Sequence, residues 1–371
     1  MIWVYLLKIS RLMISVYKSI FKLSVFLHQN PKMKNKLLPL ILVTLLVFPS
    51  CKETKPVYDS FTGFIQGTTY SIVYENSGKL DPVTMKQNTE KIFHDFDLSL
   101  SLYNDSSVLS RINRNESVIP DSFFIEVFNQ SRSLSALTGG AFDVTVGPLV
   151  KAWGFGPDEH KNISESKRDS LLKLVGMEKV SLVNGELMKS DPLITLDFNA
   201  IAQGYSVDVI CAYFDRMKIR SYLVEIGGEV KVKGAKGGNA WRIGIDRPED
   251  NNMLPGNNLQ AIITIEDEAI ATSGNYRKFY VDNGVKYSHT INPKTGYPAK
   301  NTLLSATIVA DKCSFADGIA TACMVMGKDS SIALIIKNKL DGYLIYSDEN
   351  GNFQTWISEN LKKNISESEP G

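Results

Sequence analysis

The strongest constraint on the fold is the interleaving, after residue 57, of short alternating apolar segments with longer segments of helical period. Alternation from Phe61 to Tyr74 predicts two strands joined by a turn near Gly67. The next segment opens with Asp81-Pro82, which is typical of an N-cap followed by a proline in the first helical turn. Apolar residues then recur at helical spacing from Ile92 to Leu100. This mixture of both periods predicts an α+β fold.

Further helices are expected from Pro120-Asp121 to Gly139-Gly140, from Ile201 to Met217 and from Phe315 to Met326. The segment Asp282-Asn283-Gly284 predicts a hairpin turn. Short strands are expected at Leu193–Asp197, Tyr222–Val232, Trp241–Ile245, Ala261–Ile265, Ala269–Thr272, Leu304–Ala310 and near Tyr343 and Phe353. Because no repeat and no long linker interrupts this series, one α+β domain over residues 57–371 is favoured over two.

The N-terminal segment, residues 1–50, is typical of an export signal. An apolar run from Leu37 to Pro49 follows three lysines and ends at Ser50-Cys51. The run of 13 residues falls short of the roughly 20 that a spanning helix needs. A lipoprotein signal therefore fits best, with Cys51 as the lipidated residue and residues 51–56 as a tether. Met33 opens a complete signal and is the expected start, although residues 1–32 are also compatible with an extra membrane segment.

Charge and cysteine usage exclude some classes of function. Lys and Arg total 41 against 40 Asp and Glu, without a basic run in the body of the chain, so no nucleic-acid partner is expected. The cysteines other than Cys51 are Cys211, Cys313 and Cys323, and none has a partner at zinc-ligand spacing. Each lies among apolar neighbours, which predicts buried free thiols.

Asp317 and Thr321 are the clearest candidates for a metal site. They lie four residues apart on the expected helix Phe315–Met326, which places a carboxylate and a hydroxyl on one face. Two such oxygens can form half of a Mg²⁺ site that also holds substrate phosphates. Ser314-x-x-Asp317 also matches a capping box, and a threonine can bond back to its own helix. The motif by itself favours the cap.

Two other segments bring polar groups or glycines to the end of an element. Leu196–Tyr205 places Asp197 at the end of an expected strand and next to a helix N-terminus, which attracts phosphate and carboxylate groups. An ordinary cap explains Asp197 equally well. Thr138–Asp143 is a glycine-rich approach to an expected strand, where backbone can come close to a ligand. A helix C-cap explains its glycines but not Asp143.

His289 is the one histidine in a motif-like setting, between the expected hairpin and the segment Thr290–Gly296. A single histidine is more often structural than catalytic. Nucleotide-binding and hydrolase motifs such as G-x-G-x-x-G, the Walker loop and G-x-S-x-G are absent from the sequence.

Taken in order, these segments resemble the ApbE family of FAD:protein FMN transferases from about Phe64 to Gly327. The segments that carry the resemblance are Gly67-Thr68, Tyr103 followed by Ser107–Asn113 as one motif, Thr138–Pro148, Leu196–Tyr205, Glu225–Gly228, Ala271–Arg277, His289–Gly296 and Ala316–Thr321. Each is weak by itself, but eight motifs in one order are highly specific.

The resemblance implies a Mg²⁺-dependent enzyme that moves FMN from FAD to a threonine hydroxyl of an acceptor protein and releases AMP. Metal ligands would be Asp317, Thr321 and the carbonyl of Ala200. Catalytic roles would fall to Asp317 and to His289. Flavin-nucleotide contacts would come from Gln66, Tyr103, Ala141, Phe142, Asp143, Asp197, Gln203 and Ile291. Gln66 replaces a common methionine and Gln203 a common Lys or Glu of the family.

The resemblance also implies partners and a location. The acceptor would be another protein, of the kind found as flavoprotein subunits of membrane redox complexes, because the chain lacks an acceptor motif of its own. The enzyme would be anchored by lipid in a bacterial cell envelope, on the periplasmic side. Two alternatives use the same site: a Mg²⁺-dependent FAD pyrophosphatase, in which water replaces the threonine, and a lipoprotein that binds FAD without chemistry. Transfer of FMN to threonine and hydrolysis of FAD by water both need the reacting groups to be positioned and the charge on the phosphoryl group to be neutralised.

Overall fold

The computed structural model describes residues 56–76, 78–155, 163–249, 252, 256–275, 279–282, 285–288 and 290–367, with the backbone alone at 279–288. Contacts divide the chain into Met1–Lys55 and Pro56–Gly371. The expected signal segment, the tether, Cys51 and His289 lie outside the described residues. Within the ranges given, no helix is long and apolar enough to cross a membrane.

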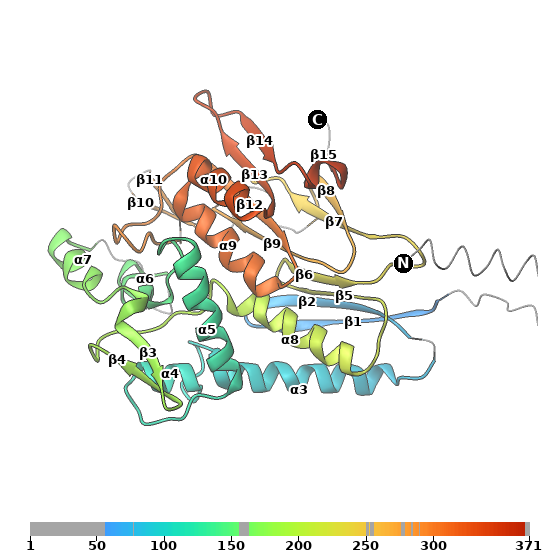
Figure 1. Cartoon of the computed structure of the whole chain (residues 1–371), viewed down its shortest axis with the longest axis horizontal. Helices are drawn as coiled ribbons and strands as arrows, with labels where there is room; N and C mark the ends of the chain where they lie inside the picture. Colours follow the sequence, from blue (N-terminus) through green and yellow to red (C-terminus); the bar gives the residue numbers. More distant parts are fainter. Residues whose placement is uncertain are drawn as a thin grey trace, which may run out of the picture. The chain divides into compact units, whose positions relative to one another are not determined.

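An antiparallel sheet organises the domain (Figure 1). Its strands, in spatial order, are β1 (Tyr58–Ile65), β2 (Thr68–Glu75), β5 (Tyr222–Ile226), β6 (Glu229–Lys233), β9 (Ala269–Gly274), β12 (Leu303–Ala310), β13 (Asp341–Ser347) and β14 (Phe353–Ile357). The strand pair expected at residues 61–74 is β1 and β2, joined at Gln66-Gly67. Alternate residues of β2 are buried, which is the period expected of a strand with one face in the core.

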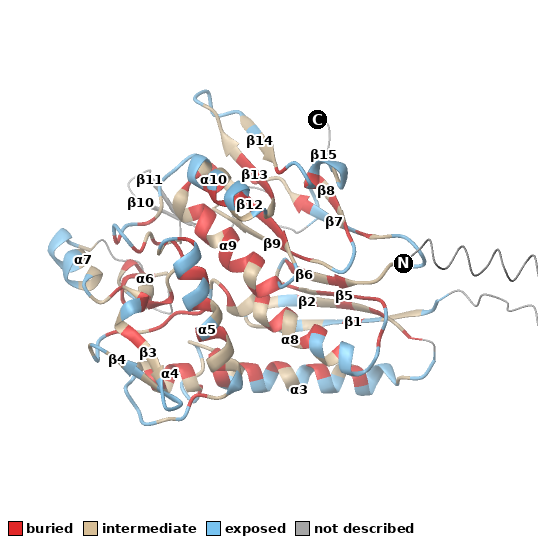
Figure 2. Ribbon diagram, viewed as in Figure 1, coloured by how far each residue is buried: buried red, intermediate tan, exposed pale blue. Residues whose placement is uncertain are grey.

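Helices lie on one face of this sheet. Those that contact its strands are α3 (Pro82–Leu100), α8 (Ala202–Arg216), α9 (Cys313–Met326) and α10 (Lys328–Asn338), and α5 (Ser122–Leu137) packs on α3 and α9. The shorter helices are α4 (Val108–Asn113), α6 (Gly147–Trp153) and α7 (Glu165–Leu172). Helix α8 packs on β5 and β6, and α9 packs on β9 and β12. The largest apolar clusters lie between these helices and the sheet, where Figure 2 shows buried residues lining the inner faces of α8 and α9.

The opposite face of the sheet is covered by a smaller sheet of β15 (Ile365–Glu367), β8 (Leu259–Ile265) and β7 (Trp241–Asp246). Val232, Ile270 and Tyr343 of the large sheet pack there with Trp241 and Ile263. The hairpins β3–β4 (Val180–Val183 and Glu186–Lys189) and β10–β11 (Phe279–Asp282 and Val285–Ser288) complete the strands among the described residues. The expected α+β class and the strand pair around residues 282–285 are confirmed.

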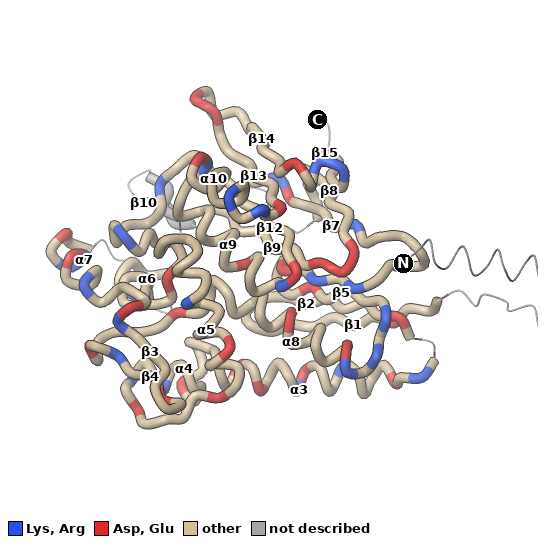
Figure 3. The backbone as a smooth tube through the Cα atoms, viewed as in Figure 1, with Lys and Arg blue, Asp and Glu red and all other residues tan. Residues whose placement is uncertain are grey.

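Several helix starts that the sequence predicts are confirmed. Asp81 accepts a hydrogen bond from Thr84 N (3.0 Å), and Asp121 accepts one from Phe124 N (2.9 Å), so both aspartates cap the helices that the sequence predicts. The three thiols of Cys211, Cys313 and Cys323 are free and buried, as expected. Basic and acidic side chains are interspersed along the backbone (Figure 3).

Two segments expected as strands are not strands. Leu193–Asp197 lies outside any sheet: Leu193 belongs to a turn, and the Asn113 side-chain amide, not a neighbouring strand, pairs with the backbone of Leu196. The amide donates to Leu196 O (2.9 Å) and its carbonyl accepts from Leu196 N (2.8 Å). The chain after Asp143 forms a 3-10 turn, Val144–Val146, since the Asp143 carboxylate accepts a hydrogen bond from Thr145 N (2.8 Å) and caps the turn.

Candidate active site

Helix α9 brings Asp317 to the N-terminus of helix α8. The Asp317 side chain is buried, with 6% of the residue exposed, and its Oδ2 accepts a hydrogen bond from Gly204 N (3.1 Å). Gly204 lies in the first turn of α8, where backbone N–H groups have no partner within the helix. Asp317 therefore caps α8 from a neighbouring helix. The capping box within α9 is wrong: Ser314 donates its hydroxyl to Asp208 Oδ2 (2.8 Å) instead.

Thr321 lies one turn further along α9, and its hydroxyl is paired with a strand. Thr321 Oγ1 is 3.1 Å from Ser273 Oγ of β9. Within the described part of the chain this is the hydroxyl's hydrogen-bond partner, so the alternative in which Thr321 bonds back to its own helix is not what the structure shows. The pairing fixes the Thr321 hydroxyl on the side of α9 that faces β9.

The carbonyl of Ala200 belongs to the tight turn that leads into α8. Ile201 N and Ala202 N both donate to Phe198 O (3.0 and 2.8 Å), and Asp197 Oδ1 accepts from Asn199 N (2.8 Å). If α8 began one turn earlier, Gly204 N would donate to Ala200 O, four residues back. That N–H donates to Asp317 here, so the Ala200 carbonyl is left for another partner at the helix end that Asp317 caps.

This donor set fits a hard divalent cation. A carboxylate, a hydroxyl and a backbone carbonyl are oxygen donors of the type that Mg²⁺ prefers, and Mg²⁺ usually takes few protein ligands together with substrate phosphates. Burial raises the pKa of Asp317 to about 7, because a charge in this place is poorly solvated. A bound cation would compensate that charge. No group of three or more His, Cys, Asp or Glu able to hold a metal occurs among the described residues, so a metal site here would depend on this mixed set.

Gln66 and Gln203 lie beside this helix terminus. Gln66 occupies the left-handed region (φ 52°) in the β1–β2 turn, and its Oε1 accepts from Ser206 Oγ of α8 (3.3 Å). Its Nε2 is buried and has no hydrogen-bond partner within the described residues. Gln203 Nε2 donates to Ile226 O (3.2 Å) at the end of β5. The unpaired Gln66 amide is therefore available as a donor to a ligand.

Asp143 and Asp197 are held together by the backbone. Asp197 N donates to Val144 O (2.7 Å), which joins the segments that carry the two carboxylates. Burial raises the pKa of both carboxyl groups, although each also accepts backbone hydrogen bonds that oppose the rise. Asp143 accepts from Thr145 N and, through Oδ2, from Met177 N (3.1 Å). Its carboxylate therefore holds the turn after Asp143 against the segment that begins at Met177.

The remaining expected contact residues lie in different settings. Ala141 and Phe142 are buried in the core, 5% and 2% exposed, so their backbone is what they can offer a ligand. Tyr103 is 69% exposed, and partial desolvation together with the nearby Asp197 carboxylate raises the pKa of its phenol. Ile291 packs in a separate cluster with Leu149, Trp153 and Val175.

The sequence pattern missed residues that hold the site together across the fold. Asp208 of α8 contacts the first residues of α9, Lys231 of β6 contacts Asp208, and Ser273 contacts Thr321. The only local signal for Asp208 is its place four residues after Gly204, on the same face of α8. Its partner residues Cys313 and Ser314 lie more than a hundred positions away, where no local pattern reports them.

Comparison with known proteins identifies the family. The sequence profile of the ApbE family matches residues 66–344. A FAD:protein FMN transferase of Vibrio cholerae is 35% identical over 333 residues, which cover 88% of this chain and 98% of the relative. A FAD:protein FMN transferase of Haemophilus influenzae is 35% identical over 84% of this chain and 92% of its own length.

Solved structures share the fold. The flavin transferase ApbE from Vibrio cholerae superposes with a TM-score of 0.75 at 34% identity, covering 83% of this chain and 99% of that one. The apo form of Pseudomonas stutzeri flavinyl transferase ApbE gives a TM-score of 0.76 at 30% identity, over 84% and 98%. Fold and site together define an α+β protein with an oxygen-donor centre where two helices cap each other. The chain belongs to the ApbE family.

Proposed function

We propose that this protein transfers FMN from FAD to a threonine hydroxyl of an acceptor protein in a Mg²⁺-dependent reaction. Curated relatives that match nearly their whole length to this chain are FAD:protein FMN transferases. The observation that carries the proposal is the hydrogen bond of the Asp317 carboxylate to Gly204 N at the N-terminus of α8, with Thr321 one turn further along α9. The products would be an acceptor with FMN in a phosphoester and free AMP.

The chain's own residues would bind and orient the substrate. Asp317, Thr321 and the Ala200 carbonyl would hold Mg²⁺, which, when bound, neutralises charge on the pyrophosphate. The first turn of α8 adds the positive end of a helix dipole at the same place. Gln66 would donate its unpaired amide hydrogens to the flavin nucleotide, and Asp197 and Tyr103 would flank it.

The acceptor hydroxyl must give up its proton as the new bond to phosphorus forms. A positioned base serves this purpose in many transferases. His289, which lies outside the described residues, and the carboxylate of Asp317 are the two candidates that this chain offers. Either group would then release the proton to solvent once AMP has left.

The proposal extends to the location of the enzyme. The apolar run Leu37–Pro49 and Cys51 support export and a lipid anchor, with residues 51–56 as the tether. A bacterial periplasmic face, next to membrane redox complexes that carry flavoprotein subunits, is the setting that suits such a transferase. Metabolic labelling with a radioactive fatty acid tests the anchor: Cys51→Ser should lose the label, and persistent labelling of that variant would refute it.

A labelling assay separates this function from the alternatives. The purified chain is incubated with FAD, Mg²⁺ and a candidate acceptor, and a denaturing gel is inspected for flavin fluorescence on the acceptor band. We expect a fluorescent band that requires both FAD and Mg²⁺. Release of FMN and AMP without a labelled acceptor would favour the pyrophosphatase, and FAD binding without turnover would favour a carrier.

A further inference from the structure

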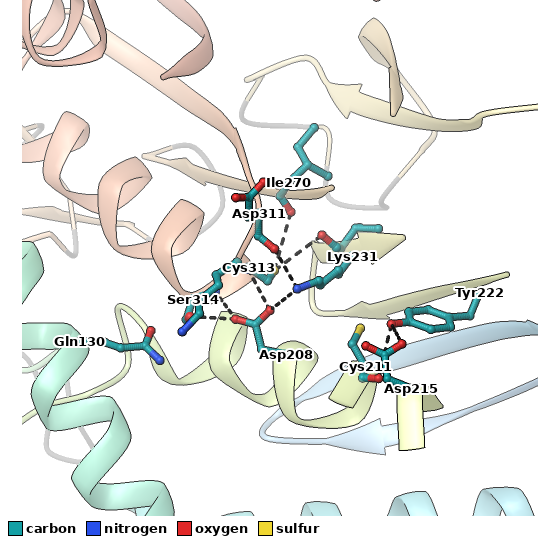
Figure 4. A network of polar contacts seen from close by, with 12 residues as sticks. Gln130, Asp208, Cys211, Asp215, Tyr222, Lys231, Ile270, Asp311, Cys313 and Ser314 are labelled. Atoms are coloured by element: carbon teal, nitrogen blue, oxygen red, sulfur yellow. Dashed lines mark hydrogen bonds and ion pairs between the residues drawn. The ribbon is translucent and has the colours of Figure 1, made fainter. Parts of the chain in front are cut away.

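Asp208 of helix α8 forms a dense set of contacts outside the expected ligand set (Figure 4). Its Oδ1 accepts from Cys313 N (3.0 Å), and its Oδ2 accepts from Ser314 N (3.0 Å) and from the Ser314 hydroxyl (2.8 Å). The ammonium group of Lys231, on β6, lies 3.1 Å from Oδ1. Only 13% of the Asp208 side chain is exposed, so solvent screens these contacts weakly.

Helices α8 and α9 therefore cap each other. Asp208 of α8 satisfies the first N–H groups of α9, whose own N-cap residue, Lys312, makes no side-chain cap. Asp317 of α9 satisfies Gly204 N in the first turn of α8, which likewise has no side-chain cap of its own. Each carboxylate interacts with the positive end of the other helix dipole. The two interactions together set the position of α9 along α8.

Two further contacts leave little freedom for that position. Lys231 also donates to Asp311 O (2.8 Å), which holds the connection from β12 to α9 against β6. The two helices touch through backbone, since a Cβ added to Gly204 would lie 2.6 Å from Cys313 O. If Asp208 is removed, the start of α9 loses its cap, and Asp317 lies only one turn further along.

We propose that Asp208, with Lys231, is a positioning residue of the metal site: it holds the Asp317 carboxylate and the Thr321 hydroxyl against the Ala200 carbonyl. This inference rests on the proposed function, because it takes these three groups as the Mg²⁺ ligands. Removal of a residue that orients a metal ligand without binding the metal typically weakens metal affinity by about 10- to 100-fold. Asp208 makes no hydrogen bond to these three groups among the described residues, and it would act on them through the first turn of α9.

The test compares Asp208→Ala with a matched control, Asp215→Ala. Asp215 lies on the same helix and also pairs with a lysine of β6, Lys233 (2.7 Å), and with the Tyr222 hydroxyl (3.0 Å), but it makes no contact with α9 among the described residues (Figure 4). For each full-length protein, isothermal titration calorimetry with MgCl₂ gives the metal affinity. Labelling assays then give the Mg²⁺ half-saturation and the KM for FAD, and thermal unfolding reports the fold.

We expect Asp208→Ala to weaken Mg²⁺ binding and to raise the Mg²⁺ half-saturation at least about tenfold, with the KM for FAD within about twofold of the wild-type value. Asp215→Ala should keep the wild-type Mg²⁺ response. Asp208→Asn retains an acceptor oxygen for α9 but loses the charge pair with Lys231. Its Mg²⁺ affinity should therefore lie between those of Asp208→Ala and Asp215→Ala. If Asp208→Ala does not fold, Asp208→Asn takes its place in the comparison.

The outcomes distinguish this inference from the proposed function. A folded Asp208 variant with the wild-type Mg²⁺ affinity, or an equal loss in Asp215→Ala, would overturn the positioning role. A wild-type chain that neither binds Mg²⁺ nor labels an acceptor would overturn the proposed function itself.

Discussion

Replacing Gly204 with alanine should damage both the fold and the site, because α9 leaves no room for a side chain at this residue of α8. A Cβ there would lie 2.6 Å from Cys313 O and 2.8 Å from Asp317 Cβ, whereas ordinary contacts begin at 3.4 Å. Relief of the first contact alone requires a separation of 3.4 − 2.6 = 0.8 Å, and neither backbone is a flexible side-chain end. The same movement stretches the 3.1 Å hydrogen bond from Gly204 N to Asp317.

Three contributions determine the expected change in the free energy of unfolding for Gly204→Ala. Overpacking costs about 1–3 kcal/mol, and a lost hydrogen bond to a charged group costs about 1.5–3 kcal/mol. The higher helix propensity of alanine offsets about 1 kcal/mol of this loss of stability. The free energy of unfolding should therefore fall by roughly 1.5–5 kcal/mol. Displacement of the Asp317 carboxylate by nearly an ångström should also lower FMN transfer by about 100-fold.

Thermal unfolding and the labelling assay check Gly204→Ala, with Ala212→Gly as the control. Ala212 is exposed on the same helix, so the reverse exchange should cost only about 1 kcal/mol of stability and leave FMN transfer intact. Wild-type melting and wild-type transfer in Gly204→Ala would show that the helices do not meet as described here.

Three further substitutions test separate parts of the site and the core. Asp317→Asn should reduce transfer at least about 100-fold while leaving the melting temperature of the metal-free protein unchanged or higher, since a buried charge is removed; undiminished transfer would rule out Asp317 as a ligand. Gln66→Ala should raise the KM for FAD by up to about tenfold with little change in kcat, because one hydrogen bond to the ligand is lost, and an unchanged KM would contradict that contact. Phe198→Ala should lower the free energy of unfolding by about 3–5 kcal/mol in denaturant titration, because this ring is 1% exposed and packs edge-on against Phe124 at 5.3 Å; a loss below 1 kcal/mol would argue against this core.

The parts of the fold that local chemistry determines could be predicted from the sequence. Asp81 and Asp121 were recognisable as caps because a cap acts on residues three positions away. The alternation in β2 was recognisable because it records one buried face. The segment Leu193–Asp197 looked like a strand for a related reason, since Ile194 and Leu196 are buried, but Asn113 at the end of α4 supplies the hydrogen bonds of Leu196.

The candidate site was only partly predictable for the same physical reason. The spacing of Asp317 and Thr321 showed that they share a helix face, but their partners come from other elements. Gly204 and Ser273 lie far from them in sequence, so the local pattern pointed to a cap within α9. The one local signal for Asp208, its spacing from Gly204, does not reveal its partners, because its role arises only once α8 and α9 are packed together.

The most direct test of the account is mass spectrometry of an acceptor protein after incubation with the enzyme, FAD and Mg²⁺. The account predicts FMN bound covalently to one acceptor threonine, one AMP released for each FMN transferred, and no adduct with Asp317→Asn. Free FMN and AMP beside an unmodified acceptor, or an adduct of equal yield with Asp317→Asn, would contradict it.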